Sequence, residues 1–127
     1  MPPDIIWNLQ DFQIDPSRPL YEQFVEQIRA MIAKGQLAPG TRLPSVRETA
    51  ASLRVNPTTV MKAYQELERL RLTITHRGQG TFVTDEADAI RQSRRELARG
   101  AVRRMEELAS SIGLTLEELI ALANEEE

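Results

Sequence analysis

The chain has 127 residues, of which 41% are hydrophobic, and a net charge of −3. This length holds one ordinary domain with a modest extension, and the apolar content is enough for a core. The absence of cysteine excludes disulfides and thiolate metal sites, and the single histidine, His76, excludes a metal site of neighbouring histidines. No apolar run is long enough to span a membrane and the N-terminus lacks a secretory signal, so we expect a soluble, cytoplasmic protein.

The first 18 residues predict a short strand or an extended arm. Prolines interrupt this segment, and apolar residues alternate with polar ones between residues 5 and 14. From Pro19 the period becomes that of a helix, with an apolar stripe of Leu20, Phe24, Ile28 and Met31 or Ile32. Gly35 follows where a left-handed residue can end this helix, and Pro39-Gly40 predicts a turn.

Residues 43–70 contain two helix starts separated by a tight turn. Ser45 stands three residues before Glu48, the spacing of a capping box in which each side chain satisfies a free N–H of the first turn. Asn56 can accept from the first amides of a second helix, and Pro57 suits the first helical position, where a missing N–H has no cost. The pattern predicts a helix-turn-helix.

Both helices of residues 43–70 have an apolar face and a polar face. The apolar positions predict the core, which we expect Trp7 to join; they are Val46, Ala50 and Leu53, then Val60, Tyr64 or Ala63, Leu67 and Leu70. The opposite face of the second helix carries Thr58, Thr59, Met61 and Lys62 near its N-terminus. Small hydroxyl side chains with one long cation suit a helix that enters a DNA major groove.

Residues 71–84 have the period of β-strands. An alternating stretch at residues 72–76 predicts one strand, and residues 81–83 predict its partner. The turn between them is basic and contains glycine: Arg77, Gly78, Gln79 and Gly80. Three helices followed by such a hairpin are a winged helix. Its small tip lets the backbone approach a phosphate or a minor groove while Arg77 reaches in, and the alternative interpretation is an ordinary hairpin turn.

Residues 85–127 predict two amphipathic helices. The first continues to Gly113, and Thr115 with Glu118 makes a second capping box that starts the last helix. We expect their apolar stripe to pair with the same stripe of a second subunit, because most soluble oligomers are two-fold homodimers. The stripe consists of Ile90, Leu97, Ala101, Met105, Leu108, Ile112, Leu116, Leu119 and Ile120.

The pattern therefore predicts a mainly α fold with a small β-hairpin, an α+β chain in two parts. Residues 1–84 form the winged helix-turn-helix domain with the arm 1–18, and residues 85–127 form a short dimerisation segment. The charge divides at the same place. Residues 41–84 have seven basic and three acidic side chains, a net of +4, whereas residues 85–127 have six basic and eleven acidic ones, a net of −5. We expect the basic middle of the chain to meet an acidic partner.

The motifs at residues 19–70 and at HRGQGTFV, residues 76–83, resemble the DNA-binding domain of the GntR family of bacterial transcription regulators. The short C-terminal part is similar to the YtrA-like subfamily, which lacks large effector-binding or aminotransferase-like domains. The resemblance covers about residues 12–84 by motif. It implies a dimeric repressor on a palindromic operator, with a transporter operon and its own gene as targets.

The resemblance also implies which residues contact DNA. They lie in the first helix of the helix-turn-helix, at the start of the second and in the wing: Arg47; Asn56, Pro57, Thr58, Thr59 and Lys62; Arg77, Gly78 and Gln79. Arg47 has an alternative interpretation as a solvated surface arginine. No cofactor is implied, and an effector would have to bind between subunits or between domains, because about forty residues after Val83 are too few for a separate pocket.

The sequence departs from the family pattern at three places. Arg54 and Arg71 stand where glycine is common, so we expect a left-handed backbone at both, at some cost. Thr73-Ile74 replaces an apolar-then-acidic pair, which implies different packing of the first wing strand.

An enzyme is not predicted, because no nucleophile with a base, no carboxylate pair in a pocket and no metal ligands can be assembled from these residues. The competing interpretation is a protein-interaction module that uses the C-terminal helices without specific DNA binding. Salt dependence separates the two, since phosphate contacts release counterions.

Overall fold

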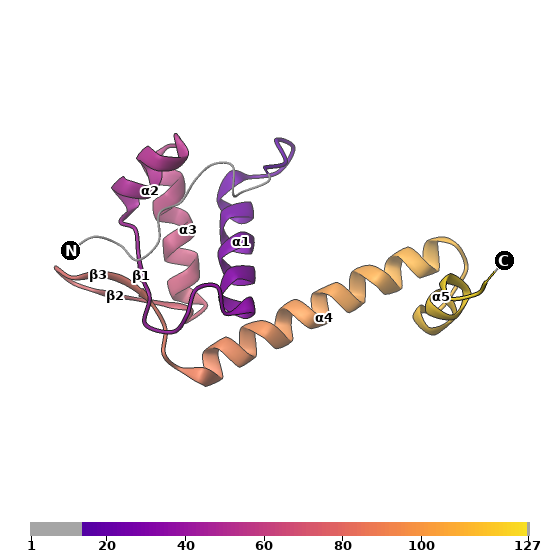
Figure 1. The fold of residues 1–127 in the computed structure, drawn as a ribbon. Helices are drawn as coiled ribbons and strands as arrows, with labels where there is room; N and C mark the ends of the chain where they lie inside the picture. Colours follow the sequence, from indigo (N-terminus) through magenta and orange to yellow (C-terminus); the bar gives the residue numbers. More distant parts are fainter. Residues whose placement is uncertain (1–13, 127) are drawn as a thin grey trace. The chain divides into compact units, whose positions relative to one another are not determined.

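The computed structural model describes residues 14–126 as helices joined to a small sheet (Figure 1). The chain divides into two compact units between Ser93 and Arg94. No helix of the described part is long and apolar enough to cross a membrane. The elements are α1 (Leu20–Lys34), β1 (Arg42–Leu43), α2 (Val46–Leu53), α3 (Pro57–Arg69), β2 (Thr73–His76), β3 (Gly80–Val83), α4 (Ala87–Ser111) and α5 (Leu116–Ala123).

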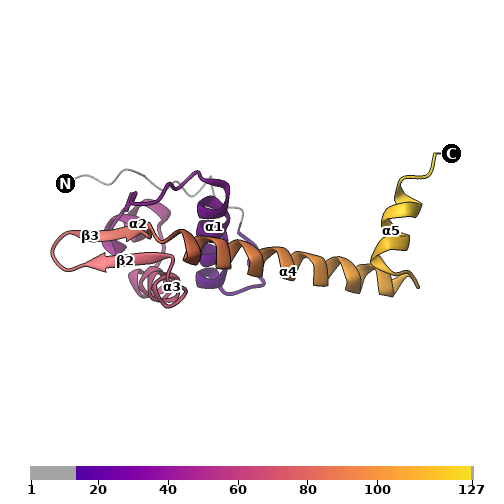
Figure 2. The same cartoon turned by 90° about the horizontal axis from the view of Figure 1, so that it is seen from below.

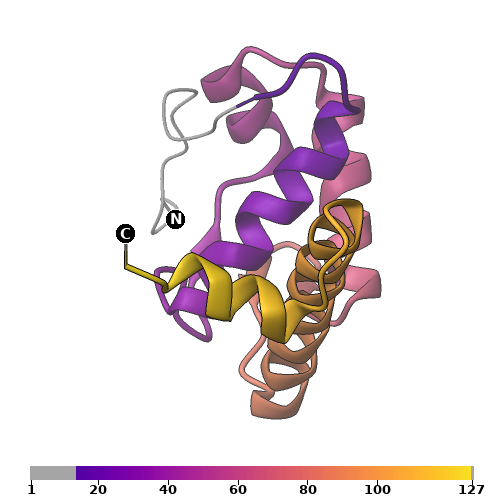
Figure 3. The ribbon, with the colours of Figure 1, turned by 90° about the vertical axis from the view of Figure 1, so that its right-hand side faces the viewer.

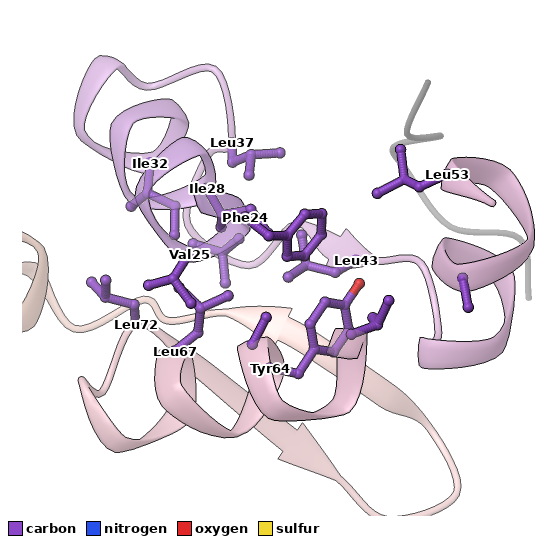
Figure 4. Packing of buried hydrophobic residues seen from close by; sticks show 14 residues of the cluster. Phe24, Val25, Ile28, Ile32, Leu37, Leu43, Leu53, Tyr64, Leu67 and Leu72 are labelled. Carbon is purple, nitrogen blue, oxygen red and sulfur yellow. The ribbon is translucent and has the colours of Figure 1, made fainter. Parts of the chain in front are cut away.

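The first unit is a winged helix, as the sequence predicts. Helices α1 and α3 lie side by side, and the β2–β3 hairpin projects beyond the helices (Figures 1 and 2). Side chains from α1, α2, α3 and the strands meet in one core (Figure 4). Its largest members include Phe24, Ile28, Ile32, Leu37, Leu43, Leu53, Tyr64, Leu67 and Leu72.

The helix starts and ends follow the sequence signals. The Ser45 hydroxyl accepts from the Glu48 N–H and the Glu48 carboxylate accepts from the Ser45 N–H, both at 3.0 Å, which confirms the capping box. The Asn56 side chain accepts from the Thr58 N–H at 2.8 Å at the start of α3. Gly35 ends α1 with a left-handed backbone. The ends of these helices therefore coincide with the capping residues that the sequence contains.

The sheet has a third strand that the sequence pattern did not indicate. Its order is β1-β3-β2 with antiparallel neighbours, and Arg42 of β1 pairs with Phe82 of β3. With two residues, β1 is too short to show an alternating pattern. Gly80, expected in the turn, opens β3 opposite His76. The turn is therefore shorter than the predicted one, and residues 77–79 are called the wing tip below.

The expected left-handed backbone is confirmed at two positions. Arg54, after α2, has φ 56°, and Arg71, after α3, has φ 63°, so both adopt the left-handed conformation that favours glycine.

In the wing, Thr73 is buried with 2% of its surface exposed, and Ile74 is half-buried. The replacement of an apolar residue by Thr73 thus places a hydroxyl group inside the domain.

The predicted N-terminal arm is described only in part. Residues 1–13, including Trp7, lie outside the described residues. Residues 14–18 form no strand and instead make a turn, because the Asp15 carboxylate accepts from the Ser17 N–H at 2.9 Å and from the Ser17 hydroxyl at 2.7 Å. These two hydrogen bonds are the main reason why the pKa of Asp15 lies below its usual value.

The first turns of α4 belong to the first unit. Ala89 is buried, and Ile90 packs against the core of this unit. Arg29 on α1 donates through Nε to the Ser93 hydroxyl at 3.1 Å. Arg71 pairs with Glu86 just before the helix begins. Apolar packing of Ala89 and Ile90 and polar contacts of Glu86 and Ser93 therefore fix the start of α4 to the winged helix.

The second unit contains the rest of α4 and all of α5. Gly113, with φ 78°, separates the two helices, and α5 turns away from the direction of α4 (Figures 2 and 3). The predicted capping box is present, with the Thr115 hydroxyl accepting from the Glu118 N–H at 3.1 Å. Ala109 is fully buried, and its carbonyl accepts from the Leu114 N–H at 2.9 Å just beyond Gly113. The helix order predicted for residues 85–127 is confirmed.

Candidate nucleic-acid interface

The helix-turn-helix is held rigid by one buried hydrogen-bonded group. The Tyr64 hydroxyl of α3 donates to the carbonyl of Pro44 at 2.6 Å and accepts from the Thr49 hydroxyl of α2, 2.9 Å away. The Tyr64 ring also stacks on Phe24, with centroids 6.2 Å apart. These contacts join α2, α3 and α1, so the outer faces of α2 and α3 have a fixed mutual orientation.

The start of α3 presents the small polar surface that the sequence predicts. Pro57 and Thr58 are exposed, and Thr59 is half-buried. Lys62 is exposed one turn further along, where its ammonium group lies 4.1 Å from the centroid of the Tyr21 ring. Asn56 is exposed, but its side-chain oxygen is used as the helix cap. Free N–H groups at a helix N-terminus favour an anion such as phosphate.

Arg47 lies on the exposed side of α2. It forms no hydrogen bond or ion pair within the described part of the chain. Its neighbour Glu48 is engaged in the capping box, where the Ser45 N–H and then the Ser45 hydroxyl lower the pKa of the Glu48 carboxyl. The Arg47 guanidinium is therefore available to a ligand.

The wing tip combines exposure with a constrained backbone. Arg77, Gly78 and Gln79 are exposed, Gly78 has φ 79°, and the Gln79 N–H donates to the His76 carbonyl at 2.9 Å. Below it, the Thr75 and Thr81 hydroxyl groups lie 3.1 Å apart across the hairpin. Arg77 forms no ion pair with any described carboxylate. The tip thus offers one cation on a turn without bulky side chains.

Arg42 is the residue at the wing that sequence reasoning missed. Its Nε donates to the Gln79 carbonyl at 3.2 Å, and a Cβ atom on Gly80 would lie only 2.8 Å from this Nε. A side chain at residue 80 would have to displace the end of the Arg42 side chain, and Gly80 also has φ 125°, a backbone conformation that favours glycine. The contact could have been predicted from a basic residue in a strand that pairs with the strand containing a glycine. The sequence pattern did not predict β1, so this signal was not available.

The electrostatic balance of this surface favours a polyanion. Of the acids between residues 41 and 84, Glu48 caps α2 and Glu66 pairs with Arg69. The Arg69 side chain is the main cause of the lowered pKa of Glu66. The exposed cations at α2, α3 and the wing tip keep their charge uncompensated, so they can neutralise phosphates.

Neither a metal-binding group nor a catalytic pair is found at this surface among residues 14–126. Among the described residues, no group of three or more histidine, cysteine, aspartate and glutamate side chains could hold a metal ion. A shallow hollow of about 450 Å³ on the wing is open to solvent and is lined by Gly40, Ile74, His76, Gln79, Phe82, Val83 and Asp85. It carries no nucleophile with a base.

The residues predicted for dimerisation fall into three groups. Met105, Leu108, Ile112 and Ile120 are 41%, 60%, 63% and 52% exposed, and Ala101 is exposed as well. Leu97, Leu116 and Leu119 are half-buried. Ile90 lies against the core of the first unit instead. Val102 and Leu122, which were not predicted, add to the exposed apolar surface.

Known proteins resemble this chain over the same elements. The sequence profile described as bacterial regulatory proteins, gntR family, matches residues 20–83. The uncharacterized HTH-type transcriptional regulator YhcF of Bacillus subtilis is 41% identical over 114 residues, which are 87% of this chain and 91% of YhcF. The HTH-type transcriptional repressor YtrA of the same organism is 49% identical over 77 residues, 59% of either chain.

Solved structures agree with this result. A GntR family transcriptional regulator from Listeria monocytogenes has a TM-score of 0.81 and 36% identity, and the match covers 90% of this chain and 100% of that one. The DNA-binding domain of AraR in complex with operator ORE1 has a TM-score of 0.50 and 28% identity over 57% of this chain and 92% of its own. Profile, relatives and fold together show that the chain belongs to the GntR family of bacterial transcription regulators, which are non-enzymatic DNA-binding proteins.

Proposed function

We propose that this regulator is a repressor that binds a palindromic operator as a homodimer. Each subunit places the N-terminus of α3 in a major groove, and the wing tip touches the adjacent minor groove or backbone. The C-terminal helices hold two such units about one helical turn of DNA apart.

The uncompensated cations carry this proposal. Arg47, Lys62 and Arg77 are exposed and form no ion pair with any described carboxylate. Phosphate contacts position a protein on DNA and base contacts specify the sequence. Arg47 and the first residues of α3 have the length and polarity for base edges, while Lys62 and Arg77 suit phosphates. The AraR domain, whose fold is similar, was solved with operator DNA.

The exposed apolar stripe supports the homodimer. Met105, Leu108, Ile112 and Ile120 are each more than two-fifths exposed within one unit of modest size. Large apolar patches on a protein surface mark interaction sites, and a two-fold dimer is the commonest way to cover one. Two-fold symmetry of the protein in turn favours a palindromic operator.

Repression and the choice of target rest on similarity. YtrA, which shares 49% identity over 77 residues, is named a repressor. YtrA-like regulators are associated with transporter operons, so we propose such an operon and the protein's own gene as targets in the cytoplasm. Binding over a promoter would exclude RNA polymerase.

The test is fluorescence anisotropy with the duplex upstream of the protein's own gene and a scrambled duplex, at two salt concentrations. We expect tight binding to the upstream duplex that weakens steeply with salt, and much weaker binding to the scrambled duplex. Equal, weak binding to the upstream and the scrambled duplex would contradict the proposal that the protein regulates its own gene. No binding at low salt would contradict DNA binding and favour a protein-interaction module based on the apolar stripe.

A further inference from the structure

One of the cations assigned to DNA is held by an aromatic ring from another helix. The Lys62 ammonium on α3 lies 4.1 Å from the centroid of the Tyr21 ring on α1. Helices α1 and α3 lie side by side in the first unit (Figure 1), so the contact crosses their interface. An ammonium over a ring face at this distance makes a cation–π contact.

The Tyr21 ring is itself held in place. It is half-buried and packs against the hydrophobic core, between the start of α1 and α3. Gln23 fixes the chain just before α1, because its amide donates to the carbonyl of Asp15 at 2.7 Å and to that of Arg18 at 3.0 Å. The ring can therefore act as a rigid support for a flexible side chain.

No acid competes for Lys62 within the described residues. On α1, Glu26 pairs with Arg18, and no ion pair joins Lys62 to a described carboxylate. The absence of a carboxylate partner matters because a carboxylate would cancel the charge of the Lys62 ammonium group. A ring face orients the group and leaves its charge and its outer N–H bonds available to an anion.

We propose that Tyr21 is a positioning residue for operator binding, whose ring holds the Lys62 ammonium ready to donate to a DNA phosphate. This inference rests on the proposed function. Lysine loses considerable rotamer freedom when it binds, and a side chain that is already restrained loses less. A cation–π contact at an exposed site corresponds to an effect on affinity of about two- to fivefold.

The test is a double-mutant cycle measured by anisotropy on the duplex that the wild-type protein selects from random sequences. Tyr21→Leu removes the ring, Lys62→Met removes the charge, and Tyr21→Phe is the matched control that keeps the ring and loses the hydroxyl. Tyr21→Met is a second ring-free variant. Thermal unfolding of each variant checks that the fold is retained.

We expect Tyr21→Phe to bind as the wild type does, and Tyr21→Leu and Tyr21→Met to bind about two- to fivefold more weakly. Lys62→Met should lose more affinity and lower the salt slope by about 1, as the loss of one phosphate contact requires. In the Lys62→Met background, Tyr21→Leu should have no further effect, because its role is to position that one lysine.

Two results would overturn the inference while leaving the proposed function intact. The first is an additive cycle, in which Tyr21→Leu weakens binding equally with and without Lys62, since the ring would then act through the fold. The second is a loss in Tyr21→Phe as large as in Tyr21→Leu, since the hydroxyl would then matter and not the ring. A wild-type protein that selects no sequence would instead contradict the proposed function, and this inference with it.

Discussion

Two buried threonines at the base of the wing differ in whether their hydroxyl groups have a partner. Thr73 opens β2 with 2% of its surface exposed, and its Oγ1 has no hydrogen-bond partner among the described residues. Thr84, just after β3, is 1% exposed, and its Oγ1 accepts from the Glu86 N–H at 3.1 Å. Valine has the shape of threonine without the hydroxyl group. The pair Thr73→Val and Thr84→Val therefore isolates the effect of one hydrogen bond.

The expected changes in unfolding free energy have opposite signs. A buried hydroxyl without a partner costs about 1–3 kcal/mol, and its replacement by an apolar group of the same shape is neutral or stabilising. We expect Thr73→Val to raise the free energy of unfolding by about 1 kcal/mol, which corresponds to about 4–8 °C in Tm for a domain of this size. Thr84→Val should lower the free energy of unfolding by about 1 kcal/mol, because the Glu86 N–H loses its acceptor.

Urea and thermal unfolding followed by circular dichroism measure both variants against the wild type. An unchanged dependence on urea would show that the midpoint shift reflects stability alone. If Thr73→Val destabilises the protein as much as Thr84→Val does, the reasoning is refuted, since the Thr73 hydroxyl would then have a partner such as a buried water.

Four further predictions follow from the same structure. Arg54→Gly should raise the unfolding free energy by about 1 kcal/mol in the same urea assay, because glycine adopts the left-handed backbone of this residue without strain; an unchanged midpoint would contradict that cost. Glu48→Ala should lower Tm at pH 7, and the difference should vanish as the pH falls through the lowered pKa of Glu48; a difference in Tm of the same size at acid pH would contradict the role of the Glu48 carboxylate in the cap. Arg47→Ala should cost about 1–3 kcal/mol of operator affinity with unchanged Tm, and unaltered sequence preference would show that this residue reads no base. Deletion of residues 113–127 should weaken the dimer, seen as a larger monomer fraction in light scattering, and should weaken operator binding with it; a truncated chain that stays as dimeric as the wild type would show that these residues do not contribute to the interface.

The parts of the fold that depend on neighbouring residues were predictable. Capping at Ser45 and Asn56 and the end of α1 at Gly35 each depend on a few adjacent positions, whereas the left-handed Arg54 was expected from the resemblance to the family. Such local signals are present in the sequence before any tertiary contact forms.

The parts that depend on distant pairing were not predictable. The strand β1 exists because Arg42 pairs with Phe82, far away in the chain, and two residues cannot show a period. Apolar spacing placed Ile90 on one stripe with Leu108, but spacing does not distinguish a core contact within the chain from a contact with another subunit. The ring of Tyr21 at Lys62 likewise follows from the packing of two helices.

The measurement that tests the account most directly is selection of operator sites from random duplexes with the wild-type protein, followed by sequencing. The account predicts one enriched motif that is an inverted repeat, with half-site centres about 10 base pairs or a multiple of that apart, because two copies of α3 must enter successive major grooves on one side of the duplex. An asymmetric motif would contradict the symmetric homodimer. A pool without any enriched motif would contradict sequence-specific binding by the α3 surface.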